Sequence, residues 1–303
     1  MYERHFGLTE RPFALTPDPA FLYRGRKHQT ALTMLEYALA NRMPVVAVTG
    51  RIGTGKTTLI RHLVGSSDTH TTVGVIANTH KHFGTLAQWV ALAFGLAHET
   101  QDKAVLHGRL VAFLRAEHAE GRKAVLIVDE AQNLDIDTLE ELRLLTNVNS
   151  DKDVLLQLVL CGQPELRDKL ARPELEQFAQ RIAVDYHIEP LDPRETREYV
   201  QHRLVVAGAS GEIFQSSAFR PIYAWSAGVP RLINALADTA LVYAYAEGKM
   251  RVNGRLVQEV IDEKRAHGTL NPGFGCGTDS VIAREHGVLQ EYNRAPCGAG
   301  EEQ

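Results

Sequence analysis

The chain has 303 residues, of which 44% are hydrophobic and 23% are charged. This composition is typical of a soluble globular protein of about two domains, and it excludes disordered, collagen-like and coiled-coil chains. The 33 Lys and Arg residues against 37 Asp and Glu residues give a net charge of −4. The chain as a whole therefore has no positive field that would hold nucleic acid or an anionic membrane, although local patches can exist.

Neither export nor membrane spanning is expected. The longest apolar runs, such as residues 154–160, are much shorter than the ~20 residues that cross a bilayer. The first residues, MYERHFGL, carry too many charges to begin a signal peptide. The three cysteines, Cys161, Cys276 and Cys297, are too few and too scattered for a disulfide framework or a Cys-x-x-Cys metal site. We therefore expect a reducing, cytoplasmic setting.

The first two thirds of the chain predict an arm followed by an α/β domain. Residues 1–27 are rich in Pro, aromatic residues and Arg without a sustained period, and we expect an extended arm that needs a surface to pack against. From residue 28 to 190, apolar runs alternate with helical patterns, as in a parallel sheet covered by helices on both faces. The expected strands are residues 45–48, 72–77, 124–128, 154–160 and 182–187, and the expected covering helices are residues 83–95, 103–120 and 137–147, with a further helix at 28–41.

The character of the sequence changes after Pro190. Helical patterns follow one another with no convincing strand between them, at residues 193–207, 215–226, 230–246 and 254–266. They predict a small all-helical domain over residues 191–267. Residues 268–303 are rich in Gly and show little apolar periodicity, so we expect a mostly disordered tail.

The sharpest chemical signal is a phosphate-binding loop directly after the first expected strand. A complete G-x-x-x-x-G-K-T motif, followed by Thr58, is formed by Gly50, Arg51, Ile52, Gly53, Thr54, Gly55, Lys56 and Thr57. Such glycines let successive backbone N–H groups and a helix N-terminus point at one anion, the phosphate chain of a nucleotide. Lys56 would then lie at the β- and γ-phosphates, and the Thr57 hydroxyl would bind Mg²⁺. A Gly-rich turn with a stray Lys is the alternative, and the spacing and context disfavour it.

Two carboxylates end the third expected strand, in the sequence VLIVDE at residues 125–130. Burial of the strand places Asp129 and Glu130 at its carboxyl end, where ligands bind in open α/β sheets. Asp129 can then hold the magnesium ion, directly or through water, and Glu130 can polarise the attacking water. Alone, such a run is a common strand terminus. Together with the phosphate loop, the two acids favour hydrolysis of ATP over binding alone.

Four further residues carry weaker signals. Arg181 precedes the last expected strand and could reach a neighbouring subunit's active site as an arginine finger, although a lone Arg more often lies at the surface or in an ion pair. Arg231 follows Pro230 at the start of an expected helix, where it could point at the phosphates or be solvated. Asn78 and Gln163 follow the second and fourth expected strands at the same sheet edge, and each could instead cap a loop.

Further motifs along most of the chain carry a family resemblance. They are Pro12-Phe13 and Thr16-Pro17-Asp18-Pro19 in the arm, LIVDEAQNL at 126–134, GQPEL at 162–166, QRIAVDYHIEPLD at 180–192 and AGVPRLIN at 227–234. Together with the phosphate loop they resemble the ExeA-like (general secretion pathway protein A) family of AAA+ ATPases. The resemblance extends from about residue 2 to 267. The phosphate loop alone would be generic, whereas the arm with GQPEL and QRI is specific.

The resemblance implies an AAA+ core, with a five-stranded parallel sheet in the order 5-1-4-3-2 between helices, and a small helical lid. It implies a ring-like homo-oligomer with ATP and Mg²⁺ at the subunit interfaces. The expected parts are an arm (1–27), a P-loop domain (28–190) and a lid (191–267). The resemblance assigns Lys56 and Thr57 to the first nucleotide motif, and Asp129 and Glu130 to the second. It assigns Gln163 to sensor one, Arg231 to sensor two and Arg181 to the arginine finger. Asn78 would be the residue that holds Glu130 inactive until a partner binds.

The chain departs from the family at two points. Arg51 stands where relatives commonly have Glu, which changes how the loop is contacted from outside without touching the phosphate-binding atoms. The membrane helix and the peptidoglycan-binding region of full-length secretion members are not found. We therefore expect a cytoplasmic protein that is peripheral to the inner membrane only through its partners.

Two functions are compatible with these residues. The first is a cytoplasmic AAA+ ATPase that couples ATP binding and hydrolysis to the assembly or regulation of an envelope secretion, pilus or exopolysaccharide-export machine. The alternative is an ATP-gated DNA-binding regulator like the transposition ATPases of the TniB type, with a ring lined by Arg24, Arg26, Lys27, Arg194, Arg197 and Arg203. The net charge argues only weakly against DNA, because phosphate contacts need only a local stripe of cations. A nucleotide-binding scaffold without turnover is disfavoured by Glu130.

Overall fold

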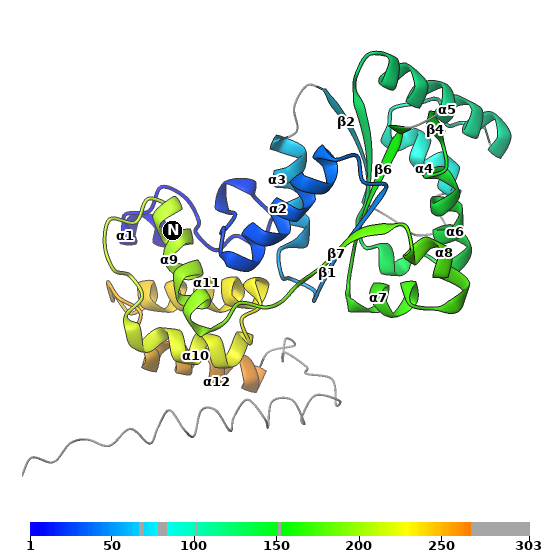
Figure 1. The fold of residues 1–303 in the computed structure, drawn as a ribbon. Coiled ribbons are helices and arrows are strands. Elements are labelled where there is room, and N and C mark those ends of the chain that lie inside the picture. Colours follow the sequence, from blue (N-terminus) through cyan, green and yellow to red (C-terminus); the bar gives the residue numbers. More distant parts are fainter. Residues whose placement is uncertain (67–69, 78–83, 101, 151–152, 268–303) are drawn as a thin grey trace, which may run out of the picture.

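The centre of the molecule is a parallel β-sheet. The computed structural model describes residues 1–66, 70–77, 84–100, 102–150 and 153–267. The sheet strands are β1 (Val45–Gly50), β2 (Thr71–Ile76), β3 (Lys123–Val128), β6 (Leu156–Gly162) and β7 (Ile182–Ile188). They lie in the order β2-β3-β6-β1-β7, and all neighbouring pairs are parallel (Figure 1). With the five strands numbered along the chain and followed from the β7 edge, this is the order 5-1-4-3-2, so the expected α/β fold is confirmed.

The inner strands are apolar because helices cover both faces of the sheet. Every residue of β1 and β6 is buried, Gln157 of β6 included, and strands buried on both faces have continuous rather than alternating apolar sequences. Along β3 successive side chains enter different cores: Val125 and Ile127 pack in one, and Leu126 packs in the other. Since β1, β3 and β6 are neighbours and run parallel, their carboxyl ends meet at one edge of the sheet.

Helices pack against the two faces of the sheet as separate groups. One face is covered by α2 (Arg26–Ala40) and α3 (Lys56–Ser66) (Figure 1). The other face is covered by α4 (Leu86–Ala93), α5 (Lys103–Ala119), α6 (Ile136–Leu145), α7 (Pro164–Leu170) and α8 (Glu176–Ala179), with the short 3-10 helices η3 (Ala131–Asn133) and η4 (Pro173–Leu175). Side chains of Thr85, Asp102 and Asp135 accept bonds from the first N–H groups of α4, α5 and α6. These caps explain where the three helices begin.

A short antiparallel hairpin precedes β6, and the sequence pattern does not predict it. Strand β4 (Asn149–Ser150) pairs with β5 (Asp153–Val154). Val154, which the apolar pattern joins to the fourth sheet strand, belongs instead to the hairpin, and the sheet strand begins at Leu156. A continuous apolar run indicates that a segment is buried. It does not indicate where one strand ends and the next strand, with a different partner, begins.

The helices that follow the last strand of the sheet form a lid with a core of its own. It consists of α9 (Pro193–Val206), α10 (Ser216–Ser226), α11 (Pro230–Ala246) and α12 (Gly254–His267). Pro occupies the first turn of α9 and of α11, where its fixed φ suits a helix and its missing N–H costs no bond. A capping box between Asp192 and Glu195 adds a second start signal for α9. One isolated parallel bridge, Phe214 to Val252, lies between the helices.

The N-terminal arm differs from the expected extended segment. It contains a short helix, α1 (Tyr2–Phe6), and a 3-10 turn, η1 (Pro19–Phe21), and it packs into the lid core (Figure 1). Phe13 is 1% exposed within that core. Arg203 of α9, itself buried, donates from Nε to the carbonyl of Pro12 and lies 4.6 Å from the centre of the Phe21 ring. The large apolar side chains of the arm show no helical or strand periodicity. They are ordered because they pack into the core of the lid, which is distant in sequence.

The two remaining expectations from the sequence concern the C-terminal tail and membrane spanning. The tail, residues 268–303, lies outside the described residues. Among the helices that the structure describes, none is both long enough and apolar enough to cross a membrane.

Candidate functional site

The phosphate loop connects β1 to α3 and depends on glycine at two positions. Gly53 and Gly55 have φ values of 81° and 99°, a backbone region that side-chain-bearing residues rarely adopt. A Cβ on Gly53 would lie 2.7 Å from the Cβ of Arg231, so only glycine lets the lid approach the loop this closely. Because α3 begins at Lys56, the unpaired N–H groups of its first turn lie at the loop and favour an anion there.

The ammonium group of Lys56 is held inside the curl of the loop. Its side chain is buried, and Nζ donates to the carbonyl oxygens of Gly50 at 2.7 Å and Arg51 at 3.0 Å. Burial lowers the pKa of Lys56 below that of an ordinary lysine, and the carboxylates of Glu130 and Asp129 oppose this effect. The loop therefore holds a cation that donates to main-chain carbonyl oxygens, and an anionic ligand would complement its charge.

Two oxygen ligands lie together beside the loop. The hydroxyl of Thr57 donates to Oδ2 of Asp129 at 3.1 Å, and Oδ1 of Asp129 accepts from the backbone N–H of Glu130 at 3.0 Å. Burial raises the pKa of Asp129, against the effect of these two bonds. A hydroxyl with a carboxylate is a donor set that fits Mg²⁺, which takes few protein ligands and completes its shell with water and phosphate oxygens. Within the described residues, no group of three or more His, Cys, Asp or Glu is placed to hold a metal ion.

Glu130 follows β3 in an unusual backbone conformation. Its φ of 52° lies in the left-handed region, which a residue other than glycine adopts at some cost. Its Oε2 accepts from Nε2 of Gln163 at 3.3 Å and from Nε2 of Gln132 at 2.5 Å. The structure thus brings Asp129, Glu130 and Gln163 together at the carboxyl edge of the sheet. Gln132 was not singled out from the sequence, although it stands in the same DEAQ quartet as the two acids.

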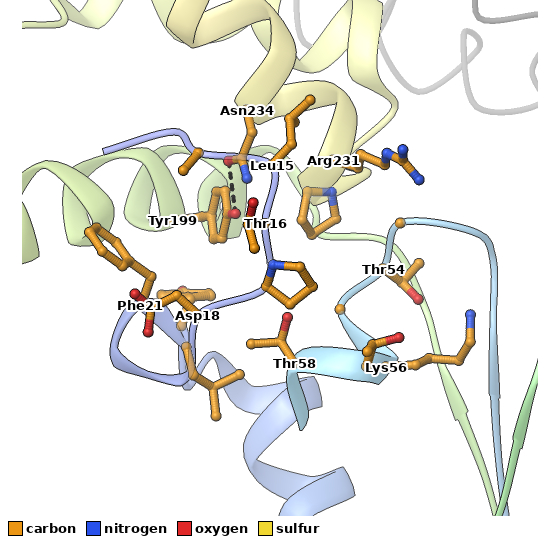
Figure 2. Close-up of a pocket in the computed structure, with 18 of the residues that line it drawn as sticks. Leu15, Thr16, Asp18, Phe21, Thr54, Lys56, Thr58, Tyr199, Arg231 and Asn234 are labelled. Carbon is orange, nitrogen blue, oxygen red and sulfur yellow. Dashed lines mark hydrogen bonds between the residues drawn. The ribbon is translucent and has the colours of Figure 1, made fainter. Parts of the chain in front are cut away.

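A cavity of about 360 Å³ opens above the loop. Its lining comes from the loop (Ile52, Gly53, Thr54, Gly55, Lys56, Thr57 and Thr58), from the arm (Ala14 to Asp18 and Phe21 to Tyr23), from the lid (Tyr199, Arg203, Pro230, Arg231 and Asn234) and from His28 and Glu130. Figure 2 shows Thr16 and Asp18 of the arm among these groups. Gly50 and Arg51 do not line the cavity. The sequence motifs of the arm did not indicate that it forms a wall of this space.

The lid contacts the phosphate loop directly. The backbone N–H of Arg231 donates to the carbonyl of Gly53 at 3.2 Å. Figure 2 shows Arg231 beside the loop, and Arg231 is one of the residues that line the cavity. The structure therefore brings the start of α11 to the loop, as the sensor-two assignment of Arg231 requires.

Arg181 lies far from the loop of its own chain. It directly precedes β7, whose first residue, Ile182, pairs with Val45 at the start of β1, whereas the loop follows Gly50 at the other end. Six residues of extended strand correspond to about 20 Å. The Arg181 guanidinium donates to Oγ1 of Thr146 at 3.0 Å. Asn78, which the resemblance assigns to hold Glu130 inactive until a partner binds, lies outside the described residues.

His28 supports the loop from α2, and no local sequence pattern indicates this role. It is 6% exposed, and its Nε2 donates to the carbonyl oxygen of Thr54 at 2.8 Å. A Cβ on Gly55 would lie 3.2 Å from this nitrogen. The other ring nitrogen, Nδ1, is buried without a hydrogen-bond partner among the described residues. Burial lowers the pKa of His28, so the folded protein favours the neutral ring.

Most of the cations suggested for a DNA-binding ring have partners within the chain. Arg203 is buried under the arm and does not present its charge to a ring surface, which corrects the expectation from the sequence. Arg194 pairs with Glu198 at 2.8 Å. Lys27 lies 3.5 Å from the carboxylates of both Glu189 and Glu195. Arg24, Arg26 and Arg197 hold exposed positions, as Arg194 does. Arg24 lies 3.1 Å from Nε2 of His62, and Arg197 lies 5.4 Å from the centre of the Phe219 ring.

Comparison with known sequences identifies relatives of this chain. The sequence pattern of the AAA domain matches residues 41–170. Over 253 residues the chain is 41% identical to general secretion pathway protein A from Aeromonas hydrophila. The match covers 83% of this chain and 46% of that protein, so the chain spans about half the length of this relative.

Solved structures with a similar fold include proteins from Aeropyrum pernix and Pyrobaculum aerophilum. The ORC2 protein of Aeropyrum pernix, in its ADPNP-ADP complexes, has a TM-score of 0.61 and 16% identity, over 95% of this chain and 86% of that chain. Cdc6p from Pyrobaculum aerophilum has a TM-score of 0.64 and 18% identity, over 88% of this chain and 73% of that chain. At such low identity the likeness shows the fold alone.

The position of His28 predicts a pH dependence of stability. Because its pKa is lower in the folded protein than in the unfolded chain, the unfolded chain binds more protons once the pH falls below about 6.5. Wild type should therefore lose stability relative to His28→Gln as the pH falls from 7.5 to 5.5, by at most ~1.4 kcal/mol per pH unit. Gln can still donate to Thr54 but does not titrate. Urea unfolding of both proteins at several pH values measures the difference.

His107 on α5 is exposed and provides the matched control. His107→Gln, measured in the same way, gives the effect of the same replacement at an exposed position. A His28→Gln difference that is constant with pH would contradict the assignment of a neutral, buried ring.

Proposed function

Because the chain belongs to the family of AAA ATPases that includes general secretion pathway protein A, we propose that it binds Mg-ATP in the cavity above the phosphate loop and hydrolyses it. The observation that carries this proposal is the convergence of Lys56, Thr57, Asp129 and Glu130 at one edge of the sheet. A phosphate cradle, a pair of metal ligands and a carboxylate base are the parts that hydrolysis of a nucleoside triphosphate needs.

Each group of the chain has a separate task in this proposal. The N–H groups of the loop and of the first turn of α3 bind the phosphates, and Lys56 exchanges its carbonyl partners for phosphate oxygens. Thr57 and Asp129 hold Mg²⁺, which supplies positive charge against the phosphate oxygens when bound. Glu130 orients the attacking water and accepts its proton. Lys56 and the N–H groups are already in place before the reaction, so they stabilise charge with little rearrangement.

The arm and the lid complete the site in this proposal. Residues 1–27, the arm, pack with residues 191–267, the lid, around one core, and both contribute walls to the cavity above the domain at 28–190. The arm walls surround the nucleoside, and Arg231 binds the phosphate chain. Because the N–H of Arg231 bonds to Gly53, a ligand that displaces the loop also displaces α11. Nucleotide state then moves the lid against the sheet.

We propose further that the protein works as a ring-like homo-oligomer in which Arg181 completes the site of a neighbouring subunit. The support for this step is that Arg181 lies at the opposite end of the sheet from its own loop. An arginine supplied by a neighbour stabilises the charge of the transition state and makes turnover depend on assembly.

The cellular role follows from the relative that is named for secretion. We propose that the protein acts in the cytoplasm, at the inner membrane through its partners, on protein components of an envelope secretion, pilus or exopolysaccharide-export machine. The chain corresponds to 46% of that relative, so its partners can differ.

Two substitutions separate binding from turnover. Lys56→Ala should abolish binding of a fluorescent ATP analogue, because the loop loses its cation. Glu130→Gln should keep that affinity but lower the rate of phosphate release about 100-fold or more, since the base is lost. Lys103→Ala, at an exposed position on α5, is the control and should behave like wild type. If Glu130→Gln hydrolysed ATP at the wild-type rate, the assignment of Glu130 as the base would be wrong.

A mixing experiment tests whether Arg181 acts between subunits. Arg181→Ala should bind ATP normally but hydrolyse it ~10³-fold or more slowly, and Glu130→Gln should be inactive as well. Mixed rings contain interfaces in which an intact Glu130 meets an intact Arg181 from the neighbour, so phosphate release should recover. If the mixture stays inactive while the two variants form mixed oligomers, Arg181 does not act in trans.

A further inference from the structure

The side chain of Gln132 joins two parts of the candidate site. Its Nε2 donates to Oε2 of Glu130 at 2.5 Å, and its Oε1 accepts from the backbone N–H of Gln163 at 2.9 Å. A backbone N–H can only donate and a carboxylate oxygen can only accept, so the two partners fix which end of the amide faces which. Gln132 therefore connects the carboxylate that follows β3 with the turn that follows β6.

The surrounding structure holds Gln132 by its main chain as well. Lys169 of α7 donates from Nζ to the carbonyl oxygens of Gln132 at 2.7 Å and Leu134 at 2.6 Å. These bonds fix the 3-10 turn η3 against α7. Gln132 thus has one anchor at its backbone and two at its side chain.

Space for this side chain is provided by a glycine at the end of β6. A Cβ on Gly162 would lie 2.9 Å from Oε1 of Gln132 and 2.8 Å from Cδ2 of Leu166. Contacts this short do not occur for real Cβ atoms, so a larger residue at 162 would displace the amide. Glycine at position 162 therefore leaves the space that the side chain of Gln132 occupies.

We propose that Gln132 is a positioning residue for hydrolysis, which orients the Glu130 carboxylate and links it to the Gln163 turn. Gln163 also donates to Oε2 of Glu130, at 3.3 Å, so two amides fix the same oxygen. The backbone of Glu130 is itself in the left-handed region, with φ of 52°. This inference rests on the proposed function, because it takes Glu130 as the base.

Kinetics of two variants test the proposal. Gln132→Ala should lower kcat for ATP hydrolysis about 10-fold or more and leave the affinity for the ATP analogue unchanged, since only the orientation of the base is lost. Gln132→Glu has the same size but turns an acceptor toward Glu130. Two facing carboxylates favour sharing one proton. The kcat of Gln132→Glu relative to wild type should therefore rise as the pH falls from 8 to 6.

Gln258 supplies a matched control for the kinetics. On α12 its Nε2 donates to Oδ1 of Asp262 at 2.9 Å, the same pairing of an amide with a carboxylate at an exposed place. Gln258→Glu should leave kcat and its pH profile as in wild type. A purely structural role of Gln132 would change stability but would not give the pH-dependent ratio.

A second readout does not depend on turnover. In nucleotide-free protein labelled with ¹⁵N at glutamine, the side-chain amide signals of Gln132 should shift when Glu130 is changed to Gln, and those of Gln258 should not. Unchanged Gln132 signals would show that the contact is absent and would overturn the inference.

The outcomes separate this inference from the proposed function. If wild type hydrolyses ATP and Glu130→Gln does not, but Gln132→Ala has a kcat equal to or above that of wild type, the positioning role is wrong and the function stands. If Glu130→Gln turns over like wild type, the assignment of the base fails, and the inference fails with it.

Discussion

The site is organised by one buried cation, the ammonium group of Lys56. Removal of a charge from water is unfavourable unless other groups replace the lost hydration, and the loop does this with the carbonyl oxygens of Gly50 and Arg51. The curl that aims these carbonyls inward needs the positive φ angles of Gly53 and Gly55. The parallel sheet then places Asp129 and Glu130 beside the same loop, because β3 and β1 flank β6 and end at one edge. A polyanion with a bound metal ion complements this arrangement of charges.

The loop is also where the other parts of the molecule meet. The lid reaches it through the bond from Arg231 to Gly53, and α2 reaches it through the bond from His28 to Thr54. The arm belongs physically to the lid, because its aromatic side chains are part of the lid core. A change in the loop on binding therefore acts on the lid and the arm together, and the same cavity that would take a nucleotide is the contact region between these parts.

The sheet and its order could be predicted because buried parallel strands have continuous apolar sequences and because the motifs resemble a known family. Lys56 could be singled out because it belongs to a contiguous phosphate-loop motif. The two acids could be singled out because they directly follow an apolar run. His28, Gln132 and the packing of the arm could not, since each depends on contacts between distant segments that leave no local pattern. Arg203 shows the same limit from the other side: its charge suggested a surface position, and the arm buries it.

The most direct test of this account is a structure of the protein with Mg²⁺ and a non-hydrolysable ATP analogue. We predict that Nζ of Lys56 leaves the carbonyl oxygens of Gly50 and Arg51 and lies within hydrogen-bond distance of a β- or γ-phosphate oxygen, with the metal ion at Thr57 and Asp129. A triphosphate bound elsewhere, with Lys56 still bonded to both carbonyls, would contradict the account.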